Sequence, residues 1–301
     1  MHKPLVNQKF GVSLSIKQCR SFNISDIDVI RTTIKDLNIK RFRLMSYWDE
    51  VEQVKGKYNF EYLDKQIQEV SKSNGEITLC LGLRQPRWPE SHWPTWAKKS
   101  NPEVWKKPLF DFIETTVKRY INNKHIVSYQ LENEALLKNF GDHGEFDRTR
   151  LNDEYKLVKE LNSKMPIVMT TSTSWGIPIR KPIPDIIGFS YYRVTFDKGA
   201  YRKSIYQPSV FRIKSRLSKL IHNRPSFIHE LQAEPWGPKN IWEMSEFEQA
   251  KSMNPEILRT NVQKAIKTGL FPIDFWGAEW WYWQKQNGNE EIWEIIKELT
   301  S

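Results

Sequence analysis

The sequence has few cysteines and no long apolar run, and both shortages narrow the class of protein. Only two cysteines, Cys19 and Cys80, occur among the 301 residues, so no disulfide framework is expected and both thiols should be reduced. No apolar run reaches the ~20 residues needed to cross a bilayer, and the N-terminal residues lack the features of a signal peptide. We therefore expect a cytoplasmic protein without a membrane partner.

Metal-ligand spacing and glycine-rich turns are also missing. His92, His143 and His229 have no ligand spacing with one another or with cysteine, so no metal site is expected. A doubly wound nucleotide-binding sheet, the second architecture that suits the chain, would usually carry a glycine-rich phosphate turn after its first strand. Gly11 stands alone at that place. We expect neither a metal nor an organic cofactor.

Positive charge is in excess, with a formal net charge of +10. Such a charge suits nucleic acid or an anionic glycan as a partner. Lysine and arginine are dispersed along the chain, however, and are dense only between Arg202 and Arg216, where no nucleic-acid motif accompanies them. We predict no nucleic-acid partner; the contrary hypothesis predicts retention on DNA or RNA that falls steeply with salt.

The chain shows no internal boundary. It has no Gly/Ser-rich linker and no low-complexity tract, and its 39% apolar and 27% charged residues are typical of a globular protein with a large core. Its length suits the roughly 250-residue size of an eightfold α/β barrel with loop insertions. We therefore expect one catalytic domain over residues 1–301.

Eight short apolar runs alternate with segments of helical periodicity, which is typical of βα units around a parallel sheet. The predicted strands are 10–14, 41–45, 77–83, 126–131, 167–171, 186–190, 226–228 and 271–278. This pattern predicts an α/β protein of the (β/α)8 barrel (TIM barrel) class.

Apolar residues between the strands recur at helical spacing, so that each set predicts one helix with a buried stripe. The sets are Ile27, Ile30, Ile34 and Leu37; Leu63, Ile67 and Val70; Phe112, Ile113 and Val117; Leu151, Tyr155 and Val158; Ile213, Leu217 and Leu220; Leu258, Val262 and Ile266; and Ile292, Ile295 and Ile296. The fifth crossover is different, because Pro178, Pro182 and Pro184 lie between Trp175 and the sixth strand. We expect its helix to be short or absent.

Two glutamates follow predicted strands at the end of a barrel where catalytic groups are found. Glu134 comes three residues after strand 126–131, and Glu230 comes two residues after strand 226–228. Strands four and seven lie across a barrel from each other, so both carboxyl groups should face one cleft. Glycoside hydrolysis needs such a pair, one protonated and one ionised, and the charge of one raises the pKa of the other.

The pattern resembles clan A of the retaining glycoside hydrolases, a superfamily of (β/α)8 barrels that includes cellulase-, β-galactosidase- and xylanase-like enzymes. Asn133 and Glu134 match the clan's acid/base dipeptide, and Glu230 matches its nucleophile. The resemblance implies that Arg43 lies near the nucleophile and that Tyr192 forms a hydrogen bond with it. It also implies that Asn133 binds the sugar hydroxyl next to the reacting carbon.

Tryptophan is abundant, with 13 residues, and some are candidates for stacking on a sugar. In the resemblance, Trp280 or Trp281 matches the tryptophan of the eighth strand that lies under the sugar. An expected loop contains Trp88, Trp93 and Trp96, which could either stack on a sugar or pack in the protein. Of the three, Trp88 is the candidate for substrate binding. Segments 47–52, 56–60 and 63–64 resemble the second βα unit of several clan families, among them β-galactosidase-like and xylanase-like members, whereas 83–89 matches neither of these two closely.

Neighbouring residues offer alternatives for several of these assignments. Glu132 lies two residues before Glu134 on the same strand face, and Glu234 lies in a loop before a proline; both are expected to be structural or secondary contacts. Arg41 faces the same side as Arg43 but lies farther from the end of its strand. His229 should point to the opposite face from Glu230, because side chains alternate along a strand.

The residues together predict hydrolysis of a β-glycosidic bond by double displacement, with retention of configuration. The expected substrate is a β-linked oligosaccharide or glycoside. The alternative is a carbohydrate-binding barrel that does not catalyse, and the presence of both carboxyl groups argues against it.

Overall fold

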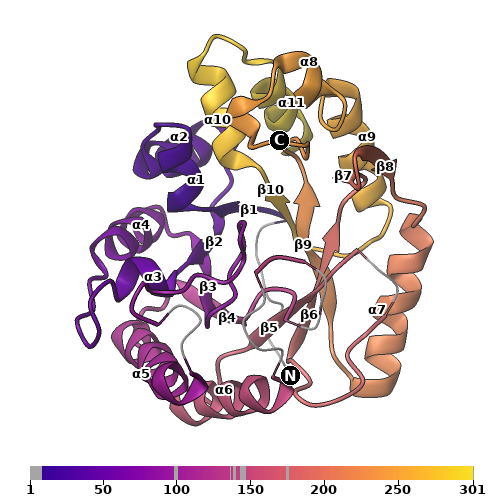
Figure 1. The fold of residues 1–301 in the computed structure, drawn as a ribbon. Coiled ribbons are helices and arrows are strands. Elements are labelled where there is room, and N and C mark those ends of the chain that lie inside the picture. Colours follow the sequence, from indigo (N-terminus) through magenta and orange to yellow (C-terminus); the bar gives the residue numbers. More distant parts are fainter. Residues whose placement is uncertain are drawn as a thin grey trace.

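The computed structural model describes residues 9–97, 101–135, 137, 140–142, 147–173 and 176–300. Eight parallel strands close into a barrel in the order β1-β10-β9-β6-β5-β4-β3-β2, with helices around it (Figure 1). The strands are β1 (Phe10–Leu14), β2 (Arg41–Met45), β3 (Glu76–Leu81), β4 (Ile126–Leu131), β5 (Ile167–Thr171), β6 (Ile186–Tyr191), β9 (Ser226–Gln232) and β10 (Ile273–Trp276). The predicted (β/α)8 barrel is confirmed.

Helices pack on the outside of the barrel and begin where polar residues can cap them. The helices are α1 (Ile16–Ser21), α2 (Asp26–Leu37), α3 (Trp48–Val51), α4 (Glu61–Lys72), α5 (Pro102–Tyr120), α6 (Arg148–Leu161), α7 (Pro208–His222), α8 (Glu246–Ala250), α9 (Pro255–Ile266), α10 (Ala278–Gln286) and α11 (Glu291–Thr300), with a 3-10 turn at Ile241–Glu243. Ser25, Asn101, Asp147 and Asn254 each accept a backbone N–H of the first helical turn. None of the described helices is both long and apolar enough to span a membrane.

The fifth crossover carries no helix in its described residues, 172, 173 and 176–185. Trp175 lies outside the described residues. The sixth crossover is instead enlarged, because a hairpin of β7 (Val194–Asp197) and β8 (Ala200–Lys203) precedes α7 (Figure 1). The expectation that the fifth helix is short or absent is confirmed over the described part.

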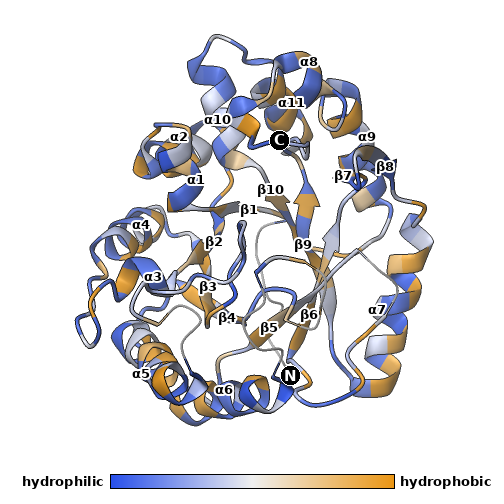
Figure 2. Ribbon diagram, viewed as in Figure 1, coloured by the Kyte–Doolittle hydropathy of each residue, from blue (hydrophilic) through white to orange (hydrophobic). Residues whose placement is uncertain are grey.

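The core lies between the barrel and the helices, whose inner faces carry the apolar residues (Figure 2). Helix α7 departs from the predicted pattern. Ile213, Leu217 and Leu220 are exposed, and the residues that face the barrel are Phe211, Lys214 and Ser218. The predicted buried stripe on α7 is therefore wrong. The exposed row and the buried row have the same helical spacing, so spacing alone cannot tell which one is buried. In the structure the row with Phe211 packs against β6.

Charged side chains fill the barrel interior below the predicted site. Arg41 donates to both carboxylate oxygens of Asp274, at 2.8 and 3.3 Å, and His229 Nδ1 lies 2.6 Å from the same carboxylate. Burial lowers the pKa of His229 to about 3, so the imidazole is neutral and Arg41 is the cation that balances Asp274. Arg41 thus belongs to the barrel floor.

Replacing Asp274 with alanine should destabilise the fold strongly. The change leaves the guanidinium of Arg41 buried without its carboxylate, which typically costs about 3–5 kcal/mol. The free energy of unfolding in urea measures the effect. Asp153→Ala is the matched control, because Asp153 forms an exposed pair with Lys156 and its loss should cost no more than about 1 kcal/mol. Equal losses in the two variants would contradict the prediction.

Candidate active site

Glu134 and Glu230 reach the barrel mouth by different local structures. Glu134 follows β4 in a turn, with a left-handed φ of 43°, and its backbone N–H donates to Thr170 Oγ1 on β5 at 2.7 Å. A positive φ is unfavourable for a residue with a side chain, and the bond to Thr170 helps to hold the turn in this conformation. Glu230 lies within β9. Both side chains are buried, with 7% and 4% of their surface exposed.

A β-bulge in β9 directs Glu230 into the barrel. Phe189 of β6 pairs with Ile228 and the next residue, Ser190, pairs with Glu230, so His229 is an extra residue in the ladder. The bulge interrupts the alternation of side chains. As a result His229 contacts Asp274 inside the barrel while Glu230 also points inward. The expectation that His229 faces away from Glu230 is wrong for this reason.

A single hydroxyl links the two carboxyl groups. Ser190 Oγ donates to Glu134 Oε1 at 2.6 Å and lies 3.4 Å from Glu230 Oε2. The oxygens Glu134 Oε1 and Glu230 Oε2 are therefore no more than about 6 Å apart. This upper bound is compatible with the separation of about 5–5.5 Å between the carboxyl groups of retaining glycosidases.

Arg43 and Tyr192 hold the carboxylate of Glu230. Arg43 Nη1 donates to Glu230 Oε1 at 2.9 Å, and its Nε donates to Ser13 Oγ, which fixes the guanidinium. Tyr192 donates its hydroxyl to Glu230 Oε2 at 3.1 Å. The structure thus brings Arg43 and Tyr192 to Glu230 as the resemblance implies, whereas Arg41 pairs with Asp274.

Asn133 is oriented by three neighbours. Its Oδ1 accepts hydrogen bonds from Gln130 Nε2 and Thr170 Oγ1, both at 3.0 Å, so the amide nitrogen must point the other way. Asn133 Nδ2 donates to Glu90 Oε2 at 2.8 Å. Burial raises the pKa of Glu90 to about 8. Glu90 is a third carboxyl group of the site that the sequence did not reveal, because it lies inside a long loop instead of at a strand end.

The two central glutamates differ in their electrostatic surroundings. Burial, and then the negative charge of Glu230, raise the pKa of Glu134 to about 7. Glu230 is paired with the guanidinium of Arg43 at 2.9 Å. The site thus combines one carboxyl group whose raised pKa lets it hold a proton up to about pH 7 with a second one that lies against a cation, as an acid and a nucleophile require.

The structure does not bring Trp280 and Trp281 to the carboxyl groups. Both lie on α10 and are buried, and their indole N–H groups donate to Gln249 Oε1 and to the Ala233 carbonyl. The tryptophan at the end of β10 is Trp276, which packs against the guanidinium of Arg43 at 5.4 Å. The predicted eighth strand ended at 278, two residues after the end of β10. The prediction therefore placed the tryptophan of this strand end at 280 or 281 instead of 276.

Trp88 lies at the outer end of a row of aromatic rings. Tyr192 contacts Trp236, Trp236 contacts Phe140, and Phe140 contacts Trp88, with ring centroids 5.3–6.0 Å apart. Trp88 is 67% exposed, which leaves its ring free to stack on a ligand. Trp93 and Trp96 instead pack against Trp48.

The two alternative glutamates have structural partners. Glu132 accepts from the backbone N–H groups of Leu83 and Arg84 and pairs with Arg150 at 3.0 Å. Glu234 accepts two hydrogen bonds from Arg87. These contacts occupy both carboxylates.

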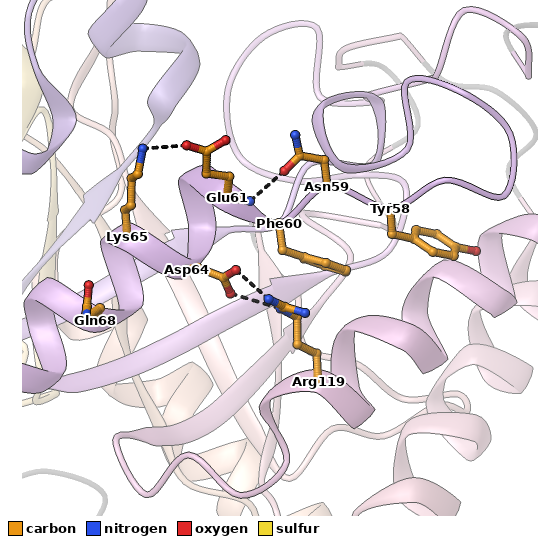
Figure 3. Close-up of a pocket in the computed structure, with 8 residues that line it drawn as sticks. All are labelled: Tyr58, Asn59, Phe60, Glu61, Asp64, Lys65, Gln68 and Arg119. Carbon is orange, nitrogen blue, oxygen red and sulfur yellow. Dashed lines mark hydrogen bonds and ion pairs between the residues drawn. The ribbon is translucent and has the colours of Figure 1, made fainter.

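A separate cavity of about 570 Å³ opens on the outer wall of the barrel, near the start of α4 (Figure 3). Residues 58–61, 64, 65 and 68 line it, together with Arg119 of α5. Arg119 donates two hydrogen bonds to Asp64 and packs over the ring of Phe60. None of the predicted site residues lines this cavity.

Parts of the chain are similar to known β-galactosidases. The model of the family Glyco_hydro_42, described as β-galactosidase, matches residues 23–109. The β-galactosidase LacZ of Lactobacillus acidophilus is 27% identical over 184 residues, which cover 54% of this chain and 27% of LacZ. The β-galactosidase BgaA of Clostridium cellulovorans is 26% identical over 126 residues, 34% of this chain and 18% of BgaA. The resemblance of this chain to β-galactosidase-like glycoside hydrolases is therefore confirmed.

Solved structures share the barrel at low sequence identity. The β-galactosidase of Rahnella sp. R3 has a TM-score of 0.64 at 12% identity, over 97% of this chain and 55% of that one. The exo-β-1,4-mannosidase Op5Man5 of an Opitutaceae bacterium has a TM-score of 0.62 at 13% identity, over 97% of this chain and 59% of that one. The chain thus spans 27% or less of the curated relatives named above and little more than half of these structures.

Ser190→Ala should move the pH profile of hydrolysis. If Glu134 is the acid, kcat/KM for a nitrophenyl β-galactoside should fall as the pH rises above about 7, because the proton needed by the leaving group is lost. The hydrogen bond from Ser190 lowers the pKa of Glu134, so its removal should shift this alkaline limb to higher pH.

The control for this change is Ser128→Ala, which removes another buried barrel hydroxyl, one that contacts Thr78. Its alkaline limb should stay where the parent protein has it. An alkaline limb that moves to lower pH in Ser190→Ala would contradict the assignment of Glu134 as the acid.

Proposed function

We propose that this protein is a retaining β-glycoside hydrolase in which Glu134 is the acid/base and Glu230 the nucleophile. The observation that carries the proposal is the contact of both carboxyl groups with one hydroxyl, that of Ser190, while only Glu230 is paired with an arginine. The arrangement supports double displacement, which uses a protonated and an ionised carboxyl group held close together.

In the first step Glu230 attacks the anomeric carbon and the glycosidic bond breaks. Glu134 gives its proton to the departing oxygen, so that the leaving group departs neutral. Arg43 and Tyr192 hold the carboxylate of Glu230 by hydrogen bonds and aim it at the carbon until the new bond forms. Asn133, whose amide nitrogen has a second hydrogen besides the one that it donates to Glu90, binds the hydroxyl next to the reacting carbon.

In the second step Glu134 acts as a base. Once Glu230 is an ester it has no charge, so one of the causes that raise the pKa of Glu134 is removed. Glu134 therefore remains ionised after it loses its proton and can deprotonate the incoming water. The water attacks the anomeric carbon, Glu230 leaves as a carboxylate, and the released sugar has its original configuration.

A β-galactoside is the first substrate to test. The family model and the curated relatives carry the name β-galactosidase. The structural neighbours also include a β-mannosidase, so the sugar is best identified with a panel of nitrophenyl β-glycosides and oligosaccharides. The exposed ring of Trp88 at the cleft rim offers a stacking surface for the part of the substrate that leaves first.

The alternative is a barrel that binds carbohydrate without turning it over. It requires none of the contacts that Arg43, Tyr192 and Ser190 make with the two carboxyl groups, and these contacts are complete. Binding of a sugar in the panel without any release of nitrophenol would favour this alternative.

Glu230→Gln should abolish turnover of every substrate, because no covalent intermediate can form. Glu134→Gln should lower kcat/KM about 10²–10⁴-fold for substrates with poor leaving groups and far less for dinitrophenyl glycosides, which need no proton. Added azide should restore turnover of dinitrophenyl substrates by Glu134→Gln, because azide attacks the intermediate without a base. The product should be the β-glycosyl azide.

Glu132→Gln and Glu234→Gln are matched controls for these variants. Each changes a buried carboxylate that is paired with an arginine other than Arg43. Both should retain more activity than Glu230→Gln once thermal melting has shown that they are folded. Full inactivity of a folded Glu132→Gln, with an active Glu134→Gln, would move the acid/base role to Glu132.

The first-formed sugar should have the configuration of the substrate. The contact of both carboxyl groups with Ser190 fits the retaining separation of about 5–5.5 Å. Proton NMR of a β-glycoside digest, read before mutarotation, should show the β-anomer first. Early α-anomer would overturn double displacement even if both glutamates were essential.

A further inference from the structure

The segment from residue 198 to residue 229 contains eight lysines and arginines and no acidic residue. Its cations are Lys198, Arg202, Lys203, Arg212, Lys214, Arg216, Lys219 and Arg224. It forms β8, α7 and the start of β9 on one side of the barrel (Figure 1). Eight positive charges within 32 residues account for most of the formal net charge of +10.

The outer face of α7 carries two parallel rows of exposed side chains. One row is aliphatic: Ile213, Leu217 and Leu220 are 45%, 36% and 82% exposed. The other row is basic and consists of Arg212, Arg216 and Lys219, all exposed. Both rows repeat every three or four residues, so each runs along the helix as a continuous stripe.

Further exposed aliphatic side chains flank the two ends of the helix. Ile205, three residues before α7, is 81% exposed, and Ile221 in its last turn is 54% exposed. Ile179 is also exposed and lies near the last turn, because His222 Nε2 forms a hydrogen bond with the carbonyl of Pro178 at 2.8 Å. The aliphatic surface therefore extends along a helix about 22 Å long and beyond both its ends.

We propose that α7 docks this protein on the surface of an anionic lipid membrane, a partner that we did not expect from the sequence. The aliphatic row would enter the boundary between headgroups and acyl chains, and the basic row beside it would contact lipid phosphates. Helices that lie on membranes have this division into an apolar side and a side rich in Lys and Arg. The proposal concerns binding only and holds whether or not the barrel hydrolyses a glycoside.

The charge of the face excludes a second copy of the chain. An isologous contact would place Arg212, Arg216 and Lys219 of each copy against the same cations of the other, with no carboxylate in the segment to balance them. The aliphatic row argues against nucleic acid and against an acidic glycan, because these ligands are bound through aromatic rings and polar groups. Leu220 could make neither kind of contact.

The face is separate from the candidate active site. The residues of α7 that face the barrel are Phe211, Lys214 and Ser218, and the two exposed rows contact none of the groups that hold Glu134 or Glu230. Variants in these rows should therefore leave the hydrolysis of a soluble substrate unchanged. Membrane binding can be measured independently of activity.

Sedimentation with sucrose-loaded vesicles tests the proposal. The protein should sediment with vesicles of phosphatidylcholine and phosphatidylglycerol at 3:1 in low salt, and should remain in solution with phosphatidylcholine alone. Raising NaCl should weaken binding. R216E/K219E should bind about 30-fold more weakly or worse, since each cation near an anionic surface contributes about 1 kcal/mol. L217S/L220S should bind at least tenfold more weakly while keeping every charge.

Two control variants separate the face from general effects of charge and hydrophobicity. K124E/K164E reverses two exposed lysines elsewhere, and F247S removes an exposed aromatic ring from α8. Both should bind vesicles like the parent protein, and circular dichroism should show that all four variants are folded. The absence of sedimentation with anionic vesicles at low salt would overturn the proposal. Equal binding by the α7 variants and their controls would also overturn it, as would retention on an acidic protein or on DNA without vesicle binding.

Discussion

Two buried carboxyl groups near one hydroxyl impose the main constraint on this barrel. Glu134 and Glu230 cannot both be ionised at such a distance without a cation, because in a water-poor interior their repulsion is large. Among the described residues, Arg43 is the cation that forms an ion pair with one of the two groups, and that group is Glu230. Burial and the charge of Glu230 raise the pKa of the other carboxyl group, Glu134, to about 7. The asymmetry needed for acid and nucleophile thus follows from where one guanidinium lies.

The position of that guanidinium depends on the barrel floor and on one irregularity in the sheet. Arg41 and Arg43 point into the barrel from the same strand, and each needs its own anion. Asp274 of β10 balances Arg41. The β-bulge at His229 turns Glu230 inward at the level of Arg43, one layer above His229. A regular strand would turn either His229 or Glu230 away from the interior, and one arginine would lose part of its surroundings.

Much of the barrel was predictable because a buried parallel strand is a short apolar run, which the sequence displays directly. The features that were missed have specific causes. The bulge at His229 adds one residue without altering the apolar pattern. The end of β10 at Trp276 depends on Gly277, whose φ of +137° ends the strand before the next apolar residues. Glu90 enters the site from a loop whose path depends on tertiary contacts. The spacing of residues along the chain predicts neither the bulge, nor the end of β10, nor the position of Glu90.

The orientation of helix α7 also could not be predicted from the spacing of its apolar residues. Its two candidate faces have equal periodicity, and the face that packs against the barrel is the one with Lys214. The ammonium group of Lys214 lies over the rings of Phe189 and Phe211, at 4.5 and 5.3 Å from their centroids. A face containing a lysine is a poorer core than a row of Ile and Leu, so burial of apolar area alone would have turned the helix the other way. As a result, the aliphatic row of α7 is exposed to solvent, beside the three cations of the basic row. A surface of that kind indicates a binding requirement outside the barrel, because folding of the barrel alone does not call for it.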